Sequence, residues 1–271
     1  MKIGVCADIT RWKAIANEKF DYVEANFSKL ASLTDEEFEG YVNEKNALGI
    51  SVEAFNGFFP SGFCIYGELL PGNRLLPSFE EKLKEIEKYA EAAFSRARRL
   101  GGRVAVFGSS HARALRDGIT REDAEAQVIR VLRVCGDVAS KYGMKIALEP
   151  IRYSEVNFIN TVDEGLDICK RVDHPSVGLL VDLFHFYMNG ESLESVKNAA
   201  DRIIHMHMAR PDPDRKYPTS VDVEACKVWA DTLYEIGYNE RISLECSFGG
   251  EIEAALVKTK CVTDLFKYSD K

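Results

Sequence analysis

The sequence predicts the α/β class and, within it, a single (β/α)₈ barrel of the TIM type. Three observations lead to this fold. Eight short and almost continuously apolar runs recur along the chain, as in a parallel sheet that is buried on both faces. Each run is followed by a segment with helical periodicity or helix-capping residues. The 271 residues fit one barrel of roughly 250 residues, and no linker divides them, so we expect one domain over residues 1–271.

The predicted strands are rich in β-branched and aliphatic residues. They cover Lys2–Asp8, Tyr22–Phe27, Ser51–Phe58, Arg103–Ser109, Lys145–Ile151, Val177–His185, Ile203–Ala209 and Arg241–Cys246. An open, doubly wound sheet is the main alternative, and it requires a Gly-x-Gly-x-x-Gly turn after the first strand. The first strand is instead followed by Ala7-Asp8-Ile9, which favours the barrel.

Helix starts are marked by a serine or threonine that is followed three residues later by an acid, a pattern that caps the first turn. Such starts are Thr34, Ser78, Thr120 and Thr161, and further starts are expected at Ser192, Asp222 and Glu251. Glycines predict ends after Leu48, Leu100 and Tyr142. The connection between Asp8 and Tyr22 is short and has room for only a turn or two of helix.

The connection from Asn56 to Ser78 is longer than the others, and it contains three prolines, four glycines and four aromatic residues. Loops of about 20 residues are uncommon within compact domains and are often functional. Because this loop follows a strand, one interpretation is a lid at the barrel mouth. A packed Ω-loop without a role in binding is the alternative.

Composition and charge limit the partners and the location. The chain is 46% hydrophobic and 29% charged, and its net charge of −8 disfavours nucleic acid. No apolar stretch approaches the roughly 20 residues of a membrane span, and the first residues resemble a strand rather than a leader. Seven cysteines without a Cys-x-x-Cys pair are expected to be reduced thiols. These features predict a cytoplasmic protein that acts on a small molecule, without nucleic-acid or membrane partners.

Four consecutive predicted strands end in side chains that can bind a metal: Glu149, Asp182, His207 and Glu245. The carboxyl ends of the strands form the active site in barrels of this kind. Three carboxylates buried together without a cation would be unfavourable, because like charges destabilise one another's ionised forms. One divalent ion resolves this conflict. The donor set suits Mn²⁺, Mg²⁺ or Co²⁺, with Zn²⁺ as a further option at lower coordination number.

The placement of histidines supports this metal site. Of the five in the chain, four lie at or just beyond predicted strand ends: His111, His185, His205 and His207. Successive side chains of a strand point to opposite faces, so His205 and His207, which are two residues apart, point to the same side. We assign His207 to the metal and His205 to a deeper layer, and the reverse assignment is the alternative.

The strand ends also carry a series of motifs. They are Glu149-Pro-Ile-Arg-Tyr-Ser-Glu155, Asn160-Thr-Val-Asp-Glu164, Asp182-Leu-Phe-His185, His205-Met-His207 and Leu244-Glu245. Over essentially the whole chain, the sequence resembles the xylose-isomerase-like sugar phosphate isomerase/epimerase superfamily. In these motifs it is most similar to the ketose 3-epimerases, such as D-tagatose and D-psicose 3-epimerase. The segments 54–60 and 106–113 look like segments of uncharacterised members.

The resemblance implies roles for the strand-end residues. One divalent metal would be bound by Glu149, Asp182, His207 and Glu245, and Glu149 and Glu245 would be the catalytic acid/base pair.

The resemblance also implies a set of substrate-binding residues. Glu155 and His185 would contact oxygens near the reacting carbon. An arginine after the seventh strand would hold the next hydroxyl; the family position is Pro213 here, and the candidates on either side are Arg210 and Arg215. Further candidates are Asn56 and His111, from the two additional segments, and Trp12, which follows the first strand and has a ring that can stack on a sugar.

These residues predict a metal-dependent isomerase or epimerase of a sugar or sugar phosphate. A metal that chelates a carbonyl and the neighbouring hydroxyl acidifies the proton on the carbon between them. One carboxylate removes this proton to give a metal-bound enediolate, and a carboxylate on the opposite face returns a proton. Arginines in the predicted mouth loops, such as Arg113 and Arg116, can bind a phosphate, and solvated surface side chains are the alternative.

Three other functions remain open. A keto-inositol-type dehydratase uses similar chemistry with loss of water. An endonuclease-IV-like DNA-repair nuclease shares the barrel but needs three zinc ions and more than five histidines. A sugar sensor would keep the pocket without needing both acid/base glutamates. Members of the superfamily are often dimers or tetramers, so the resemblance is compatible with a homo-oligomer.

Overall fold

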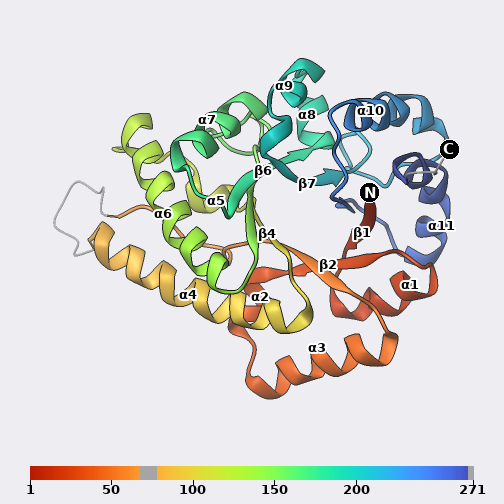
Figure 1. Cartoon of the computed structure of the whole chain (residues 1–271), viewed down its shortest axis with the longest axis horizontal. Coiled ribbons are helices and arrows are strands. Elements are labelled where there is room, and N and C mark those ends of the chain that lie inside the picture. The colour runs from red at the N-terminus through yellow and green to blue at the C-terminus, as the bar shows by residue number, and fades with distance from the viewer. Residues whose placement is uncertain (68–77, 268–271) are drawn as a thin grey trace.

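Eight parallel strands close into a barrel in the order β1 to β8, which confirms the predicted fold class. The computed structural model describes residues 1–67 and 78–267. The strands are β1 Lys2–Cys6, β2 Tyr22–Asn26, β3 Val52–Asn56, β4 Val104–Phe107, β5 Lys145–Leu148, β6 Val177–Asp182, β7 Ile203–Met208 and β8 Arg241–Leu244. The helices surround these strands (Figure 1). Because β1 pairs with β8, the first and last strands of the chain are neighbours.

Helices fill the connections, as the capping residues predict. They are α1 Trp12–Asn17, α2 Phe27–Ser32, α3 Asp35–Leu48, α4 Phe79–Leu100, α5 Ser110–Arg113, α6 Arg121–Lys141, α7 Val162–Val172, α8 Leu183–Asn189, α9 Leu193–Asn198, α10 Val223–Glu235 and α11 Ile252–Thr263. Short 3₁₀ turns cover Ile9–Arg11, Ala200–Arg202, Ser220–Asp222 and Asp264–Phe266. The cap of α3 is complete, because Thr34 and Glu37 each accept a hydrogen bond from the other's backbone amide.

The short helices α2, α5 and α8 were not predicted. The predicted sixth strand extends to His185, but the chain turns into α8 after Asp182. The Asp182 carboxylate caps this helix by accepting a hydrogen bond of 2.8 Å from the Phe184 amide. Because the first turn of α8 is also apolar and buried, periodicity alone could not distinguish it from a longer strand.

The interior of the barrel is filled by side chains, so a ligand can reach the strand ends only from the mouth. Inward-facing residues form their own cluster, in which Tyr22 packs with Ala54, Val104 and Leu180. The Tyr22 hydroxyl lies 2.8 Å from the Ser243 hydroxyl across the barrel. A side chain at Gly4 would come within 2.3 Å of the Tyr22 ring, so glycine leaves the space for this ring.

The described part of the connection after β3 is packed onto the barrel. Phe58 and Phe59 are buried against Phe107, and the Phe59 amide donates a hydrogen bond of 2.8 Å to the Ser109 hydroxyl. The loop over residues 56–78, which the sequence left open as a lid or a packed Ω-loop, includes residues 68–77, and these lie outside the described residues. No helix in the described part of the chain is long and apolar enough to cross a membrane.

Candidate metal centre

The four strand-end residues come together at the carboxyl-terminal mouth of the barrel. Asp182 ends β6, His207 lies in β7, and Glu149 and Glu245 directly follow β5 and β8. One ligand atom from each residue lies within 4.8 Å of the others. The His207 Nδ1 atom is 3.4 Å from Glu149 Oε1 and 3.2 Å from Glu245 Oε2. Glu149, Asp182 and His207 are buried, and Glu245 is half-buried.

This group fits a divalent cation. Within the described part of the chain, Glu149 Oε1 and His207 Nδ1 are buried and make no hydrogen bond, an unfavourable state unless another partner binds them. A Cβ at Gly108 would lie 1.9 Å from Glu149 Oε2, so the glycine after β4 makes room for this carboxylate. Three carboxylates and one imidazole suit Mn²⁺, Mg²⁺ or Co²⁺, and also Zn²⁺.

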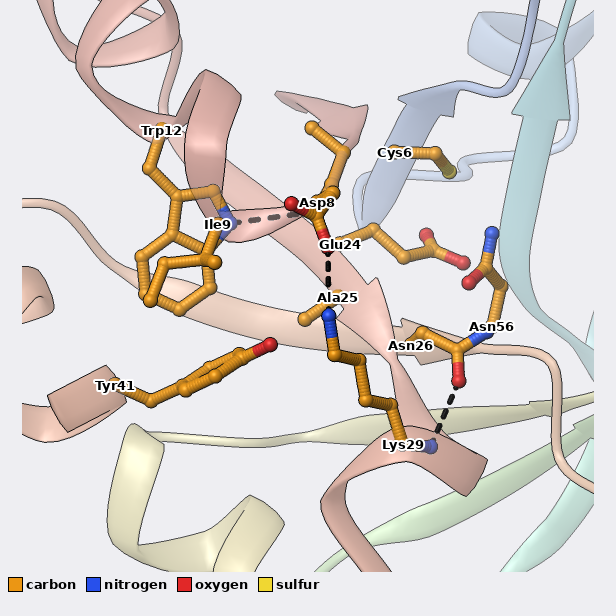
Figure 2. Close-up of a pocket in the computed structure, with 11 residues that line it drawn as sticks. Cys6, Asp8, Ile9, Trp12, Glu24, Ala25, Asn26, Lys29, Tyr41 and Asn56 are labelled. Carbon is orange, nitrogen blue, oxygen red and sulfur yellow. Dashed lines mark hydrogen bonds and ion pairs between the residues drawn. The ribbon is translucent and has the colours of Figure 1, made fainter. Parts of the chain in front are cut away.

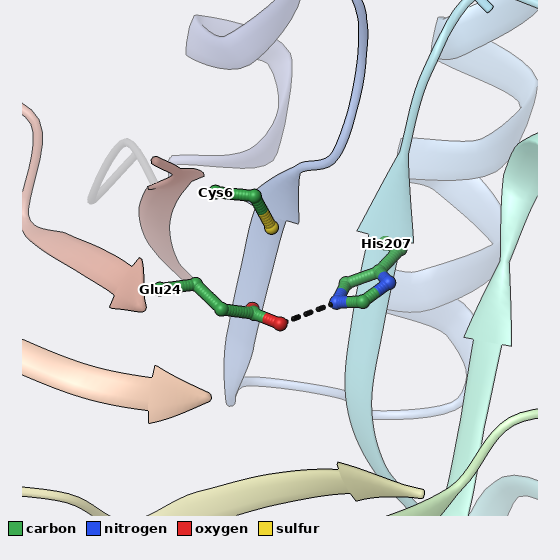
Figure 3. A group of neighbouring side chains, drawn as sticks. All are labelled: Cys6, Glu24 and His207. Atoms are coloured by element: carbon green, nitrogen blue, oxygen red, sulfur yellow. Dashed lines mark hydrogen bonds and ion pairs between the residues drawn. The ribbon is translucent and has the colours of Figure 1, made fainter. Parts of the chain in front are cut away.

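Glu24 of β2 is a functional candidate that the sequence analysis missed. Its two carboxylate oxygens lie 2.8 Å from His205 Nε2 and 2.9 Å from His207 Nε2, and all three side chains are fully buried. Burial alone would raise the pKa of Glu24, but the two imidazoles lower it to about 2. Figure 3 shows that Glu24 approaches His207 from β2, with Cys6 of β1 nearby.

The contact with Glu24 orients the imidazole of His207. When His207 donates its Nε2 proton to Glu24, its Nδ1 lone pair faces the other three candidate ligands. His205 also contacts Glu24 but is absent from the four-residue group, so the geometry supports His207 as the ligand. An isolated acid at an inward position of β2, two residues after Tyr22, is the sequence signal for this role.

Arg215 also enters the group. Its guanidinium forms ion pairs with Asp182 Oδ2 and Glu245 Oε2. Burial would raise the pKa of Glu245, but His207 and Arg215 hold it well below its usual value. Arg215, predicted to bind substrate, therefore contacts the candidate metal ligands.

Two other predicted substrate residues, Asn56 and His185, contact this group, and a third, Glu155, lies outside it. The Asn56 amide donates a hydrogen bond of 3.0 Å to Glu245 Oε1. His185 is buried, with Nε2 3.7 Å from Asp182 Oδ2. Glu155 is exposed and forms a 2.7 Å ion pair with Arg152. Their contact with substrate remains a prediction.

The structure does not bring Arg210, His111 and Trp12 into the group. Arg210 forms an ion pair of 3.2 Å with Asp222. His111 Nε2 donates a hydrogen bond of 2.9 Å to the Pro60 carbonyl, so it holds the loop after β3. Trp12 is fully buried and packs edge-on against Tyr41, and it lines the cavity described below rather than the group of candidate ligands.

Arg113, considered above as a phosphate ligand, has a structural role. It is fully buried, and its guanidinium donates hydrogen bonds to backbone carbonyls, including one of 2.7 Å to the Glu149 carbonyl. Burial lowers the pKa of Arg113 to about 10, although Glu149 opposes this effect. The side chain thus fixes the chain at the end of β5, where Glu149 begins the next connection.

A cavity of about 400 Å³ lies beside the candidate metal centre. Figure 2 shows Trp12 and Tyr41 on one side and Cys6, Glu24 and Asn56 on the other. Between them, Lys29 and Asp8 form an ion pair of 3.0 Å. Asn56 lines the cavity and also contacts Glu245, so the cavity borders the group of candidate ligands. Its polar and aromatic lining suits a small hydroxylated molecule.

The closed barrel carries its group of candidate ligands at the carboxyl-terminal mouth, which is where barrel enzymes have their active sites. Residues 12–258 match the family model described as xylose isomerase-like TIM barrel, and the chain belongs to this family. The superfamily predicted from the sequence is therefore confirmed.

Individual relatives of the chain are isomerases and epimerases. An inosose isomerase from Bacillus licheniformis is 33% identical over 139 residues, which cover 47% of this chain and 49% of the relative. The match thus spans about half the length of that protein. A D-psicose 3-epimerase structure with D-tagatose, from Clostridium cellulolyticum H10, has a TM-score of 0.76 at 20% identity over 97% of this chain and 92% of that one. The IOLI protein with a bound zinc atom has a TM-score of 0.69 at 22% identity and 98% coverage of both chains. The two structures are similar in fold.

Proposed function

We propose that the chain is a divalent-metal-dependent isomerase or epimerase of a sugar or a related cyclic ketone. The observation that carries this proposal is the convergence of Glu149, Asp182, His207 and Glu245 at the barrel mouth. The names of the relatives support the reaction class, and the zinc-bound neighbour supports a metal in this fold.

Glu149, Asp182, His207 and Glu245 would hold the ion. When bound, a divalent ion supplies Lewis-acid polarisation of a carbonyl and its neighbouring hydroxyl. The buried Glu24 keeps the Nδ1 lone pair of His207 directed to the centre.

Glu149 and Glu245 are the proposed acid and base. They follow β5 and β8, which are three strands apart around the barrel, so their carboxylates approach the centre from different sides. One carboxylate takes the proton from the carbon beside the carbonyl, and the other delivers a proton. Asn56 orients Glu245 by donating to Oε1, which leaves Oε2 directed to the centre. Return of the proton to the same carbon gives an epimer, and return to the adjacent carbon gives an isomer.

The remaining contacts of the substrate are proposed from the side chains around the centre. His185 lies beside Asp182 and can donate to a substrate oxygen, and Glu155 can accept from a hydroxyl once it leaves Arg152. The cavity beside β1–β3 would take the rest of the molecule, where Asp8 and Lys29 offer hydrogen bonds.

The test is turnover in deuterium oxide with metal-loaded protein, using a panel of free ketoses, phosphorylated ketoses and inosose. We expect an epimer or isomer that carries solvent deuterium at the reacting carbon, and loss of this exchange in Glu149→Gln and Glu245→Gln. Complete retention of the original hydrogen over many turnovers would indicate a hydride shift, and the two-base assignment would then be dropped. Loss of water from the cyclic ketone would favour the dehydratase alternative.

A further inference from the structure

We infer that Arg215 is an internal cation of the metal centre: in the metal-free chain its guanidinium neutralises two ligand carboxylates, and a divalent ion binds by displacing it. This inference rests on the proposed metal-dependent function. Its first support is direct contact, since Arg215 forms ion pairs with Asp182 Oδ2 and Glu245 Oε2. The guanidinium occupies the space beside these two oxygens. A metal ion that is coordinated by the same two oxygens cannot be there at the same time.

The charge of the group explains why a cation is needed there. Glu149, Asp182 and Glu245 place three carboxylates around one point, and such groups repel one another strongly at low local dielectric. In the described part of the chain, Arg215 is the arginine that forms ion pairs with two of them. Arg113, which is fully buried at the same end of the barrel, donates its hydrogen bonds to backbone carbonyls instead.

The backbone of the β7–α10 connection is built to direct Arg215 inward. Arg215 has a φ of 48°, a left-handed conformation that is unfavourable for a residue with a side chain and persists only where its surroundings impose it. The Ser247 amide imposes it in part by donating a hydrogen bond of 2.7 Å to the Arg215 carbonyl. The neighbouring cations point elsewhere, because Arg210 pairs with Asp222 and Lys216 pairs with Asp214.

The side chain already makes a second contact, one that does not involve the carboxylates and can persist when the carboxylates bind a metal. The Arg215 guanidinium carbon lies 4.9 Å from the centre of the Phe184 ring, and the ring face stabilises a cation without any carboxylate. Arg152 lies 4.5 Å from the same ring and is already paired with Glu155. Binding of a metal would therefore exchange one cation for another at the carboxylates and free Arg215 at the mouth of the barrel.

The experiment measures binding of Mn²⁺ by titration calorimetry on chelator-treated protein. Arg215→Gln removes the charge, Arg215→Lys keeps it on a shorter and more flexible side chain, and Arg210→Gln is the matched control from the same loop. We expect Arg215→Gln to bind Mn²⁺ more tightly by about tenfold or more, since charge-assisted hydrogen bonds no longer compete with the metal. Arg215→Lys should fall between this variant and the wild type, and Arg210→Gln should match the wild type.

Thermal unfolding gives a second readout that does not depend on activity. Metal-free Arg215→Gln should unfold at a lower temperature than the metal-free wild type, and Mn²⁺ should raise its midpoint by more than it raises that of the wild type. Unchanged or weaker Mn²⁺ binding by folded Arg215→Gln would overturn the inference.

Hydrogen exchange on the wild type tests the idea even if the variants do not fold. Mn²⁺ should increase amide exchange in residues 210–217, because the contact of Arg215 with the carboxylates is released, and equal or slower exchange there would overturn the inference.

If neither the wild type nor Arg215→Gln binds a divalent ion, the proposed metal dependence fails and this inference fails with it. If Mn²⁺ binding behaves as expected but no substrate exchanges deuterium, the inference stands and the proposed reaction is wrong.

Discussion

Replacing Glu24 with glutamine tests how much the metal affinity of the centre depends on a residue that is not itself a candidate ligand of the four-residue group. The Glu24 carboxylate accepts hydrogen bonds from the Nε2 atoms of both His205 and His207. A glutamine amide has one carbonyl oxygen and one NH₂ group, so it can accept from only one of the two imidazoles. The other imidazole must then present a lone pair at Nε2 and carry its proton on Nδ1. In His207, that proton would occupy the atom that faces the metal ligands.

The magnitude follows from this competition between tautomers. Loss of a partner that orients a ligand histidine typically weakens metal binding about 10- to 100-fold, which corresponds to about 1.4–2.8 kcal/mol. We expect Glu24→Gln to fall in this range, with Mn²⁺ affinity measured by competition with a coloured chelator.

Glu53→Gln is the matched control for this variant. Glu53 is also a buried glutamate on a strand of the barrel, in β3. It forms ion pairs with Lys2 and Arg241 at the amino-terminal end of the barrel, opposite the candidate metal centre. Its substitution should lower stability and leave metal affinity unchanged. The reasoning about Glu24 would be refuted by a folded Glu24→Gln protein that binds Mn²⁺ as tightly as the wild type.

Three further predictions concern the centre and its surroundings. Asp182→Asn should abolish metal binding but keep the cap on α8, whereas Asp182→Ala should lose both and unfold about 1 kcal/mol more easily; calorimetry and urea unfolding separate the two effects. Gly108→Ala should weaken metal binding at least about tenfold, because the new methyl group collides with the Glu149 carboxylate, with little change in the thermal midpoint. Burial raises the pKa of Glu191 from its usual 4.5 to about 7. The folded chain therefore binds this proton more tightly than the unfolded chain does, and it loses stability as the pH rises from about 4.5 to 7. Glu191→Gln should remove that loss and exceed the wild type by about 1–2 kcal/mol in urea unfolding at pH 8, after allowance for screening by solvent, with no difference at pH 4.

Each of these predictions can fail separately. Metal binding by Asp182→Asn would remove Asp182 from the ligand set. Normal affinity in Gly108→Ala would mean that Glu149 can move aside and still bind. A stability difference between Glu191→Gln and the wild type that is the same at pH 4 and pH 8 would show that Glu191 does not titrate in this range.

The sequence allowed the candidate ligands to be predicted because of a topological rule. In a parallel barrel all strand ends meet at one mouth, so polar residues that end apolar runs must converge. Glu149, Asp182, His207 and Glu245 follow this rule. The capping residues at Thr34 and Ser78 likewise predicted their helices, because capping depends only on neighbours in the sequence.

Contacts across the barrel could not be predicted in the same way. Glu24 lies inside a strand, and its role depends on the position of two histidines on a strand far along the chain. The choice between Arg210 and Arg215 depends on the course of one loop, in which Arg215 adopts a left-handed backbone and Arg210 meets Asp222. The structural role of Arg113 likewise depends on which backbone carbonyls are left without partners at the mouth.

The bond between Glu24 and His207 has a consequence for folding. The two residues are 183 positions apart in the chain, and they meet only when β1, β2, β7 and β8 are in place around the barrel. Contacts over such sequence distances form slowly, because the chain loses the entropy of closing a long loop before the contact contributes any stabilising free energy. The imidazole can therefore be oriented only after the barrel has closed. Metal uptake during refolding should be a late event, and its rate would report closure of the barrel rather than formation of the individual helices.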